Sequence, residues 1–315
     1  MPSLYLGIDG GQSSTTALIA DETGRVLGCG TGGPCNHVTG AEARAKFLRA
    51  VGDCIAQACQ EAQLDAATVH FAAVCCGFSG GAEDKDAFVR ELIRSGRYKV
   101  THDAEIALTG ATAGAPGIIV IAGTGSMAFG RNAEGKTARA GGWGYVFGDE
   151  GGAFDLVRRG LRAALRWEEG WGPATVLHAL LLESAGAETA NALLHRFYVT
   201  PRSEIARLAP LVTEAAEAGD AIAGAVINYA ASALVGYVEG VYRHLFPSGG
   251  QVPVAYIGGV FRSMPALVAF RDKLQASINC EAVPPRLSPA AGAVLDALRL
   301  DGNAANLSGA NLKAD

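Results

Sequence analysis

Short apolar runs separated by turn-forming residues open the chain. Residues 4–8, 15–20 and 25–30 are three such runs, and the acidic, glycine-ended segment 21–24 separates the last two. Apolar runs of this length between turn signals are typical of strands, so the pattern predicts a three-stranded meander. Residues 41–63 repeat their apolar positions at helical spacing instead, which predicts a helix.

The same order of elements begins again near residue 117. A glycine-turned meander is expected there for a second time, followed once more by helices. Two halves that start alike indicate an ancient duplication, and they predict an α/β protein. The strands of the second meander are expected at 117–122, 127–130 and 137–140. The elements between the meanders are expected to be a strand at 69–75, a helix at 84–95, a strand at 99–101 and a helix at 104–112.

Helical spacing dominates the chain after residue 140. We expect a small domain at 1–113 and a larger one at 114–288, with the closing helix, 289–300, packing back on the small domain. The polar residues 301–315 are expected to form a loose tail. The other elements of this half are expected to be helices at 150–166, 173–184, 189–197, 203–218, 221–245 and 265–277, and strands at 254–257 and 281–283.

Composition narrows the class of protein. A chain of 315 residues is long enough for two domains, and 49% hydrophobic with 18% charged residues is typical of a well-packed enzyme. The net charge of -5, without a Lys/Arg cluster, argues against nucleic-acid binding. We expect no signal peptide and no apolar segment of membrane-spanning length. The seven cysteines are odd in number and lack metal-ligand spacing, which favours free thiols in a reducing cytoplasm.

Two glycine-rich loops, each after an apolar run, carry the strongest chemical signal. The first covers residues 7–17 and contains Asp9, and the second covers residues 121–126. Both combine glycines with Ser or Thr hydroxyls, and such turns present N–H and O–H donors to phosphate oxygens. A glycine-rich hairpin would look similar, but the pair predicts two phosphate clamps that face each other across a cleft.

A third glycine-containing segment, 130–137, matches the P-loop expression. A P-loop needs a helix that begins at its Lys-Thr pair, so that the helix N-terminus faces the phosphates. The residues after Lys136 and Thr137 are too rich in glycine to sustain a helix. We therefore predict a hairpin turn at this segment and no phosphate site.

Asp103 stands where a strand gives way to a helix. An aspartate at that point can cap the helix by accepting one of its free N–H groups. It can also act as a general base that takes a proton from a substrate hydroxyl. Its place next to the expected cleft and to both glycine loops favours the base.

The glycine-flanked segments 141–144 and 148–152 suggest a site for a small polar ligand such as a sugar. Carboxylates hold sugar hydroxyls and an aromatic ring packs against the C–H face, and Trp143, Asp149 and Glu150 supply these groups. The two carboxylates could also favour the N-terminus of the following helix. Both interpretations can hold at once.

Two further motifs are ambiguous by themselves. Gly258 and Gly259 follow a strand, and they could bring backbone against a flat adenine or simply form a tight turn. Asn36 lies in a loop, where its amide could bind a sugar or could stabilise a turn.

Together these motifs resemble those of the actin-like sugar-kinase superfamily. Within it they are similar to the BadF/BadG/BcrA/BcrD ATPase family, which includes N-acetylglucosamine kinase and its relatives. The resemblance runs from Leu4 to about Leu300, and the block at 141–151 is its most specific part. It implies two ribonuclease-H-like domains flanking a central cleft that bind ATP, Mg²⁺ and a hexosamine. It also implies a cytoplasmic homodimer that phosphorylates the sugar 6-hydroxyl, with N-acetylglucosamine as the expected acceptor.

The resemblance also implies a role for each matching residue. Asp103 would be the catalytic base at the sugar 6-hydroxyl, and Asp9 would position Mg²⁺. The residues expected to bind ATP are Asp9, Gly10, Gly11, Gln12, Ser13, Ser14, Gly123, Thr124, Gly125, Gly258 and Gly259. The residues expected to bind the sugar are Asn36, Asp103, Ser126, Gly142, Trp143, Gly144, Asp149 and Glu150.

Two departures from the family pattern leave the identity of the sugar open. Gln12 stands where many relatives carry glycine, and Met127 stands where animal relatives carry a polar residue. Glucosamine, glucose and N-acetylmuramic acid are therefore alternative acceptors. An ATPase that activates a radical dehydratase would need exposed cysteines for an iron–sulfur cluster, whereas Cys75 and Cys76 are expected to be buried. A sugar-sensing regulator would need a DNA-binding domain before the first strand, which here begins by Leu4.

Overall fold

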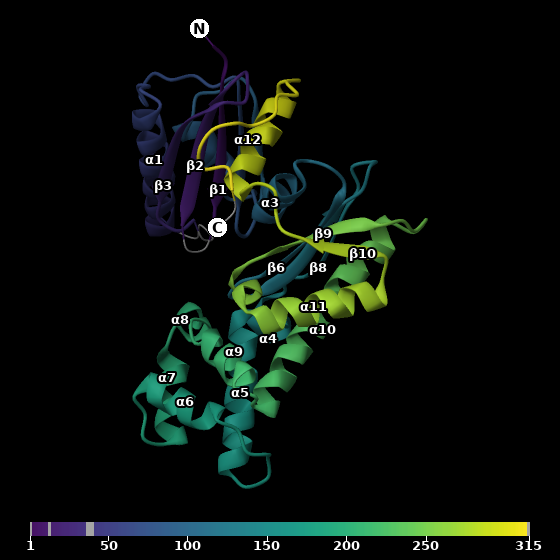
Figure 1. The fold of residues 1–315 in the computed structure, drawn as a ribbon. Coiled ribbons are helices and arrows are strands. Elements are labelled where there is room, and N and C mark those ends of the chain that lie inside the picture. The colour runs from purple at the N-terminus through teal and green to yellow at the C-terminus, as the bar shows by residue number, and fades with distance from the viewer. Residues whose placement is uncertain (1, 12–13, 36–40, 314–315) are drawn as a thin grey trace. The chain divides into compact units, whose positions relative to one another are not determined.

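The computed structural model describes residues 2–11, 14–35 and 41–313. These residues form two compact units (Figure 1). The first unit contains the residues up to 115 together with those from 285 onward, and the second contains residues 116–284. The chain therefore leaves the first unit, builds the whole of the second, and then returns.

The first unit is built on a five-stranded sheet with the order β3-β2-β1-β4-β5. Its first three strands are the antiparallel meander that the hydrophobic pattern predicts, and β4 and β5 extend the sheet in parallel to β1. The carboxyl ends of β1, β4 and β5 therefore share one edge. The strands are β1 (Leu4–Gly10), β2 (Thr15–Asp21), β3 (Val26–Gly32), β4 (Ala73–Phe78) and β5 (Tyr98–His102).

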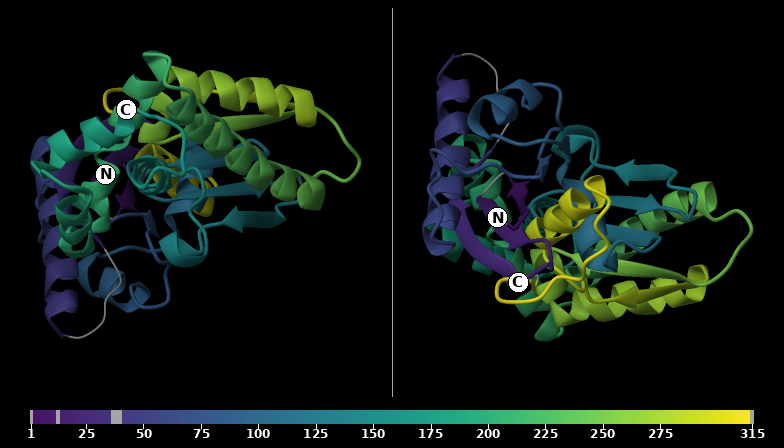
Figure 2. Two further views of the ribbon diagram at one scale, coloured as in Figure 1. Left: turned by 90° about the horizontal axis from the view of Figure 1, so that it is seen from below. Right: turned by 90° about the horizontal axis from the view of Figure 1, so that it is seen from above.

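Helices cover both faces of this sheet (Figures 1 and 2). Side chains alternate between the faces along each strand, so Leu6 and Ile8 pack with α1 and α2, whereas Tyr5 packs with α3 and α12. The helices of the first unit are α1 (Ala41–Glu61), α2 (Asp86–Leu92), α3 (Asp103–Thr112) and α12 (Pro289–Leu300).

Glycine permits the close packing of α12 on α3. A Cβ atom on Gly292 would lie 2.1 Å from the carbonyl oxygen of Ile106, and one on Gly110 would lie 2.3 Å from that of Ser288. Both distances are shorter than non-bonded atoms allow, so the two backbones can meet only without these side chains. Every residue of α12 from 290 to 298 is buried. Helix α12, the last helix along the chain, is thus part of the core of the first unit.

The second unit repeats the topology of the first. Its sheet has the order β10-β9-β6-β7-β8, in which β6, β7 and β8 form an antiparallel meander and β9 and β10 extend it in parallel to β6. Two sheets with the same strand order support the duplication inferred from the sequence. The strands are β6 (Gly117–Ala122), β7 (Ser126–Arg131), β8 (Thr137–Gly141), β9 (Val252–Ile257) and β10 (Cys280–Val283).

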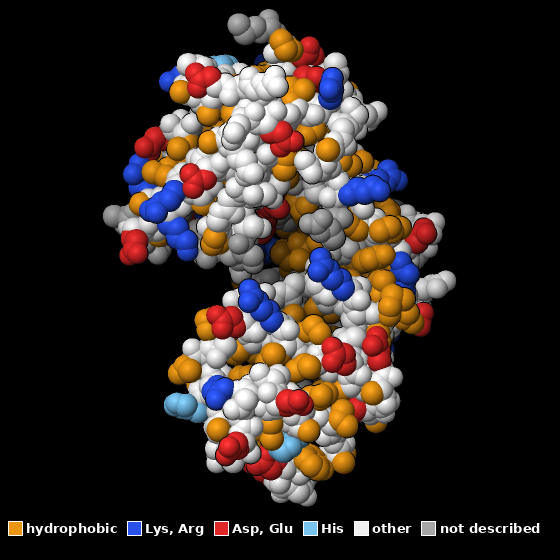
Figure 3. Space-filling model, turned by 60° about the vertical axis from the view of Figure 1, so that its left-hand side comes forward, with side chains coloured by type: hydrophobic (Ala, Val, Ile, Leu, Met, Phe, Trp, Pro, Cys, Tyr) orange, Lys and Arg blue, Asp and Glu red, His pale blue; other side chains and the backbone are white. Residues whose placement is uncertain are grey.

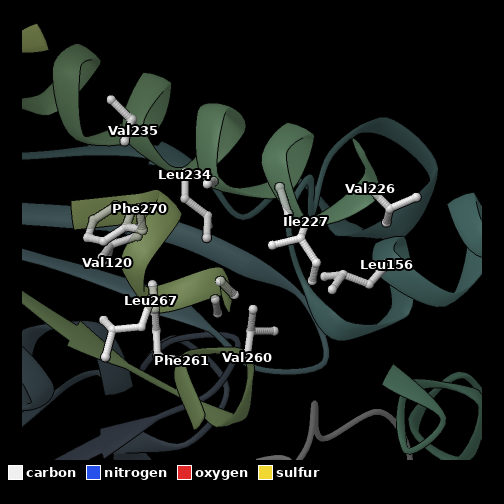
Figure 4. Packing of buried hydrophobic residues seen from close by; sticks show 14 of the residues in the cluster. Val120, Leu156, Val226, Ile227, Leu234, Val235, Val260, Phe261, Leu267 and Phe270 are labelled. Carbon is white, nitrogen blue, oxygen red and sulfur yellow. The ribbon is translucent and has the colours of Figure 1, made fainter. Parts of the chain in front are cut away.

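Helices α10 and α11 enclose the core of the second unit with the sheet (Figure 4). Ile227 and Leu234 of α10 lie in one cluster with Phe270 of α11 and Val120 of β6, and Leu156 of α5 joins the same cluster. The helices of this unit are α4 (Gly144–Phe147), α5 (Ala153–Glu168), α6 (Leu177–Ala185), α7 (Ala190–Val199), α8 (Arg202–Ala206), α9 (Ala209–Glu217), α10 (Ala221–Leu245), η1 (Gly259–Arg262) and α11 (Met264–Ser277).

Helix α10 has the length and hydropathy of a membrane span, although we expected no such segment in the sequence. Its buried residues recur at spacings of three and four, as they do along a helix with one face in a core. They include Ala223, Val226, Ile227, Ala230 and Leu234. Packing in the second unit therefore accounts for the apolar character of α10.

Several elements differ in their bounds from those expected. The strand expected at 69–75 is β4, which lies further along the chain, because Phe71 makes only an isolated bridge. The helix expected at 203–218 is divided into α8 and α9. Pro210, near the start of α9, has no N–H for a continuous helical ladder. Helix α5 begins at Ala153, three residues later than expected.

Ser308 and Leu312, which follow Asp301, form backbone hydrogen bonds with other parts of the first unit, whereas the sequence suggested a loose tail. The Val26 N–H donates to the Ser308 carbonyl oxygen, and the Ser308 N–H donates to the Gly24 carbonyl oxygen, both at 2.9 Å. The Ser288 N–H donates to the Leu312 carbonyl oxygen at 2.7 Å. Amino-acid composition does not reveal backbone hydrogen bonds of this kind, so the polar residues of this segment suggested a loose tail.

The P-loop-like segment 130–137 is a hairpin turn, as predicted. The Asn132 N–H donates to the Lys136 carbonyl oxygen at 3.0 Å, and Gly135 has a φ of +79°. Strand β8, and not a helix, begins at Thr137. The segment therefore joins two strands and lacks the helix that a P-loop uses to bind phosphate.

Charged side chains of both signs are spread over the face of the molecule that Figure 3 shows. Lys and Arg side chains are interspersed with Asp and Glu on this face. Nucleic-acid-binding proteins instead gather their basic side chains along one face or groove. Together with the net charge of -5, this distribution gives no support to a nucleic-acid partner.

Candidate active site

Three polar side chains gather at the carboxyl edge of the parallel strands β1, β4 and β5. Asp9 lies near the end of β1, Ser79 follows β4, and Asp103 follows β5. The Ser79 hydroxyl donates to Asp103 Oδ2 at 2.6 Å. The Ser79 N–H donates to the carbonyl oxygen of Gly10 at 3.0 Å. Ser79 thus links the first glycine loop to the carboxylate of Asp103.

Asp103 is the first residue of α3 and does not act as its N-cap. His102 holds the N-cap position, and Asp103 Oδ1 accepts the N–H of the next residue, Ala104, at 2.8 Å. Together with Ser79 this gives each carboxylate oxygen one protein donor. A carboxylate has about four acceptor positions, so these two bonds fix its orientation and leave room for a substrate hydroxyl. This arrangement suits a general base.

Asp9 is a carboxylate in a poorly solvated position. The surrounding protein displaces water from it, and the negative charge of Asp103 adds to the effect, so that the pKa of Asp9 rises to about 7. A bound cation would offset both causes. Carboxylate oxygen is the protein ligand that Mg²⁺ prefers, usually with phosphate oxygens of the substrate completing its shell. The environment of Asp9 therefore fits the metal-binding role that the family resemblance implies.

The first glycine loop is tightly packed at its start. A Cβ atom on Gly10 would lie 2.2 Å from the ring of Phe78, so only glycine fits there. The Gly11 N–H donates to the Ser14 carbonyl oxygen at 2.9 Å and closes a turn. Three residues expected to contact ligands lie outside the described residues, namely Gln12, Ser13 and Asn36.

The second glycine loop is a tight turn held by the start of α5. The Gly123 N–H donates to the Gly125 carbonyl oxygen at 3.0 Å. The N–H groups of Ala153 and Phe154 donate to the carbonyl oxygens of Gly123 and Thr124 at 2.8 and 3.2 Å. The loop therefore lies against the positive end of the helix dipole, where an anion is favoured.

Gly258 lies against the same loop. Its φ is +112°, and a Cβ atom on it would lie 2.4 Å from the carbonyl oxygen of Ala122, so the position requires glycine. Gly259 begins η1, and a Cβ atom on it would meet no described atom within 4 Å. Strands β6 and β9 are parallel, so the loop and this turn share the carboxyl edge of the second sheet.

Asp149 is a buried carboxylate in an unusual backbone conformation. Its φ of +60° is uncommon for a residue with a side chain, and the residue is only 5% exposed. Arg202 donates from Nη1 to Asp149 Oδ2 at 2.7 Å, and the Ser126 N–H donates to Oδ1 at 3.3 Å. The carboxylate is thus directed at the start of β7. It does not cap α5, whose N-cap is Gly152.

Glu150 is bonded to α10. The hydroxyl of Tyr237 donates to the Glu150 carboxylate, and the Glu150 N–H donates to that hydroxyl at 3.3 Å. The Ser126 hydroxyl donates to the Glu150 carbonyl oxygen at 2.6 Å. Burial, and then the bond to Glu150, raise the pKa of Tyr237, so the phenol stays a neutral donor. Tyr237 and Ser126 therefore fix the backbone of Glu150, the residue that follows Asp149.

An exposed aromatic segment precedes these carboxylates. The Gly142 N–H donates to the Ser126 carbonyl oxygen at 3.1 Å, which attaches the segment to β7. Trp143 is 66% exposed, and the guanidinium of Arg139 lies 4.9 Å from the centre of its ring. An exposed aromatic ring can pack against the C–H face of a sugar, and the carboxylates of Asp149 and Glu150 follow it within a few residues in the sequence. The exposed apolar residues that follow Trp143 are Tyr145, Val146 and Phe147.

Three residues at these sites were not anticipated from the sequence. Ser79 follows β4 at the edge where Asp9 and Asp103 were expected, so the strand order could have pointed to it. Arg202 and Tyr237 lie on helices far along the chain from the residues they contact. Nothing in their local sequence distinguishes them from surface or core residues.

The thiols of the chain are unsuited to an exposed cluster. All seven cysteines are free, and only Cys29 is not buried. Cys75 and Cys76 are fully buried on β4, as expected for packing residues. Burial raises the pKa of the Cys76 thiol, which disfavours the thiolate that a metal would need. Across the described part of the chain, no group of three or more His, Cys, Asp or Glu side chains is placed to hold a metal ion.

Replacement of Gly125 by alanine is expected to destabilise the second unit. A Cβ atom there would lie 2.5 Å from the carboxylate of Asp149, and the resulting displacement costs about 1–3 kcal/mol. Gly123→Ala is the matched control, because nothing lies within 4 Å of a Cβ atom at that position. Urea denaturation without ligands should show the loss for Gly125→Ala and a change within about 0.5 kcal/mol for Gly123→Ala. Equal free energies of unfolding for the two variants would contradict the packing of Asp149 on this loop.

Comparison with known proteins places these features in context. Residues 6–297 match the profile of the BadF/BadG/BcrA/BcrD ATPase family. The chain is 32% identical over 266 residues to an N-acetylmuramic acid/N-acetylglucosamine kinase of Clostridium acetobutylicum. The aligned residues cover 82% of this chain and 86% of the relative. The chain is 30% identical over 313 residues to an N-acetyl-D-glucosamine kinase of Dictyostelium discoideum, covering 94% and 98% of the two chains. A crystal structure from Chromobacterium violaceum, provisionally described as an N-acetylglucosamine kinase, has a TM-score of 0.77 and 28% identity, covering 93% and 98%.

Proposed function

The chain belongs to the BadF/BadG/BcrA/BcrD ATPase family, and we propose that it is a kinase that phosphorylates an amino sugar with ATP. Its two sheets of identical strand order are those of the actin-like ATPase fold that sugar kinases of this family share. We further propose that the acceptor is the 6-hydroxyl group and that N-acetylglucosamine is the preferred sugar. The names of the two curated relatives support this class of acceptor.

The observation that carries the proposal is the arrangement of Asp103. Ser79 and the Ala104 N–H orient its carboxylate, and the parallel strands place it at the same edge as Asp9. In phosphoryl transfer, a carboxylate so placed accepts the proton of the attacking hydroxyl. The oxygen then attacks the γ-phosphorus, the bond to the β-phosphate oxygen breaks, and ADP leaves with that electron pair.

Asp9 would hold Mg²⁺, which supplies positive charge that offsets the charge on the phosphate oxygens during transfer. Ser14 of the first loop and Thr124 of the second would donate backbone N–H or hydroxyl hydrogen bonds to the phosphates, and Gly11 would let the phosphates approach the first loop closely. Gly258 and Gly259 would bring exposed backbone against the adenosine. These roles follow the glycine positions at the two sheet edges, where side chains would block the approach of a ligand.

The second unit would supply further residues that bind the sugar. Asp149 offers a buried, oriented carboxylate to a sugar hydroxyl pair, and Trp143 offers an exposed ring to the C–H face. Ser126 fixes the segments that carry both residues, because it bonds the backbone of Gly142 and Glu150.

The proposal is tested by supplying purified protein and Mg-ATP with a panel of sugars. N-acetylglucosamine should stimulate ADP release and yield a sugar phosphate of the expected mass, whereas its 6-deoxy analogue should do neither. The panel also contains glucosamine, glucose and N-acetylmuramic acid, and the rates of ADP release rank these sugars as acceptors. ADP release that no sugar changes would contradict the kinase and favour an activator-type ATPase. Equal phosphorylation of the 6-deoxy analogue would contradict transfer to the 6-hydroxyl.

A cytoplasmic location and a homodimer belong to the same proposal. The seven free thiols agree with a reducing compartment. The dimer is implied by the family resemblance and has no residue-level argument of its own. Light scattering of the purified chain gives its mass directly, and a mass equal to that of one chain would contradict the dimer.

A further inference from the structure

Arg202 joins the two segments that carry the sugar-binding motifs of the second unit. Its Nη1 donates to Asp149 Oδ2 at 2.7 Å, and its guanidinium carbon lies 5.4 Å from the centre of the Tyr145 ring. Tyr145 belongs to the exposed segment after Trp143, and Asp149 belongs to the glycine-rich segment that follows. Arg202 itself is the first residue of α8, more than fifty residues later in the sequence.

The carboxylate of Asp149 needs a partner of this kind. It is almost completely buried, and a buried carboxylate without an opposite charge is strongly unfavourable. Its other bond, from the Ser126 N–H, is long at 3.3 Å, so Arg202 makes the shorter contact. The guanidinium also lies over the ring of Tyr145, and this second contact restricts the direction from which it donates.

We propose that Arg202 is a positioning residue for the sugar. It holds the carboxylate of Asp149 in one orientation, so that the remaining acceptor positions of the carboxylate face a pair of sugar hydroxyls. Arg202 contacts the protein and not the sugar, and its effect passes through Asp149. This inference rests on the proposed sugar kinase activity. It adds Arg202, which lies outside both glycine-rich segments, to the residues proposed for the sugar site.

The first test compares Arg202→Met with wild type in steady-state kinetics. The variant should raise the KM for N-acetylglucosamine by about 10- to 100-fold, which corresponds to the free energy of a hydrogen bond to a charged group. The KM for ATP should change by less than about twofold. Arg202→Lys keeps the charge and should recover part of the sugar KM. Arg207→Gln is the matched control, because Arg207 follows the same short helix, is exposed, and should leave both constants unchanged.

The second test separates positioning from general damage to the fold. In an Asp149→Asn background, the Arg202→Met change should have little further effect on the sugar KM, because the carboxylate that it orients is gone. That double variant also lacks the uncompensated buried charge, so it should fold even if Arg202→Met alone does not. Full additivity of the two changes, or an equal rise in the KM values for sugar and ATP, would overturn the inference.

Failure of the inference and failure of the proposed function give different results. If wild-type protein shows no sugar-dependent ADP release and no thermal shift with N-acetylglucosamine, the proposed function itself is wrong, and the inferred role of Arg202 is wrong as well. If wild-type protein turns over the sugar and Arg202→Met keeps the same sugar KM, only the role of Arg202 is wrong.

Discussion

Replacement of Asp103 by alanine is expected to lower kcat by about 10²- to 10⁴-fold, the range that a positioned general base contributes. The physical reason is that the attacking hydroxyl keeps its proton when no carboxylate stands ready to accept it. Binding of ATP and sugar should persist, because most of the residues proposed to hold them lie elsewhere. Single-turnover phosphorylation of N-acetylglucosamine measures the loss, and titration calorimetry measures the retained binding.

Two further variants sharpen this test. Asp103→Asn keeps the shape of the side chain and its place beside Ser79, but it is a far weaker base, so it should be as inactive as the alanine variant. Ser79→Ala removes only the hydroxyl that orients Asp103 Oδ2, and it should lower kcat by less than about tenfold. Near-normal turnover by Asp103→Asn would assign the proton transfer to another group.

Replacement of Asp9 by asparagine is expected to abolish most activity and yet stabilise the ligand-free protein at alkaline pH. The pKa of Asp9 is raised from 3.8 to about 7, so between these values the folded protein holds a proton that the unfolded chain has lost. Stability due to this group therefore falls as pH rises from about 4 to about 7, by up to about 4 kcal/mol, and by less where solvent screens the charge. The asparagine side chain of the variant would remain neutral throughout and escape this loss.

Urea denaturation of both proteins at pH 5 and pH 8, without nucleotide or Mg²⁺, measures the effect. The variant should have the higher free energy of unfolding at pH 8, and the difference should shrink at pH 5, where wild-type Asp9 is also neutral. Loss of the metal-binding carboxylate should meanwhile reduce turnover at pH 8 by at least about 100-fold. A variant less stable than wild type at pH 8 would show that the charge of Asp9 is already compensated in the protein.

The repeated meander could be predicted because each strand carries its own signal. Apolar runs bounded by turn residues mark β1, β2 and β3, and the same signal marks β6, β7 and β8. The hairpin at 130–137 could also be predicted, since its residues cannot sustain a helix. The division between α8 and α9 was missed, although Pro210 gave a local reason for it.

The candidate site could be predicted where its residues stand next to a glycine turn or, as Asp103 does, where a strand gives way to a helix. Asp9, Thr124 and Asp149 have such neighbours, and the sequence singles them out. Arg202 has no such neighbour, and Ser79 was missed although Gly80 and Gly81 follow it. The importance of these two residues comes from the sheet order and from the return of α8 to a loop more than fifty residues earlier. Contacts of this kind depend on the tertiary structure, which local patterns do not contain.

The discontinuity of the first unit has a consequence for synthesis of the protein. Helix α12 is buried against Tyr5 and Leu18 of the first sheet, so these side chains lack their cover until α12 has left the ribosome. Residues 116–284 are continuous and can fold while α12 is still being made. The unit that is translated first therefore completes its core last, and during that interval its apolar face is open to chaperones and to aggregation.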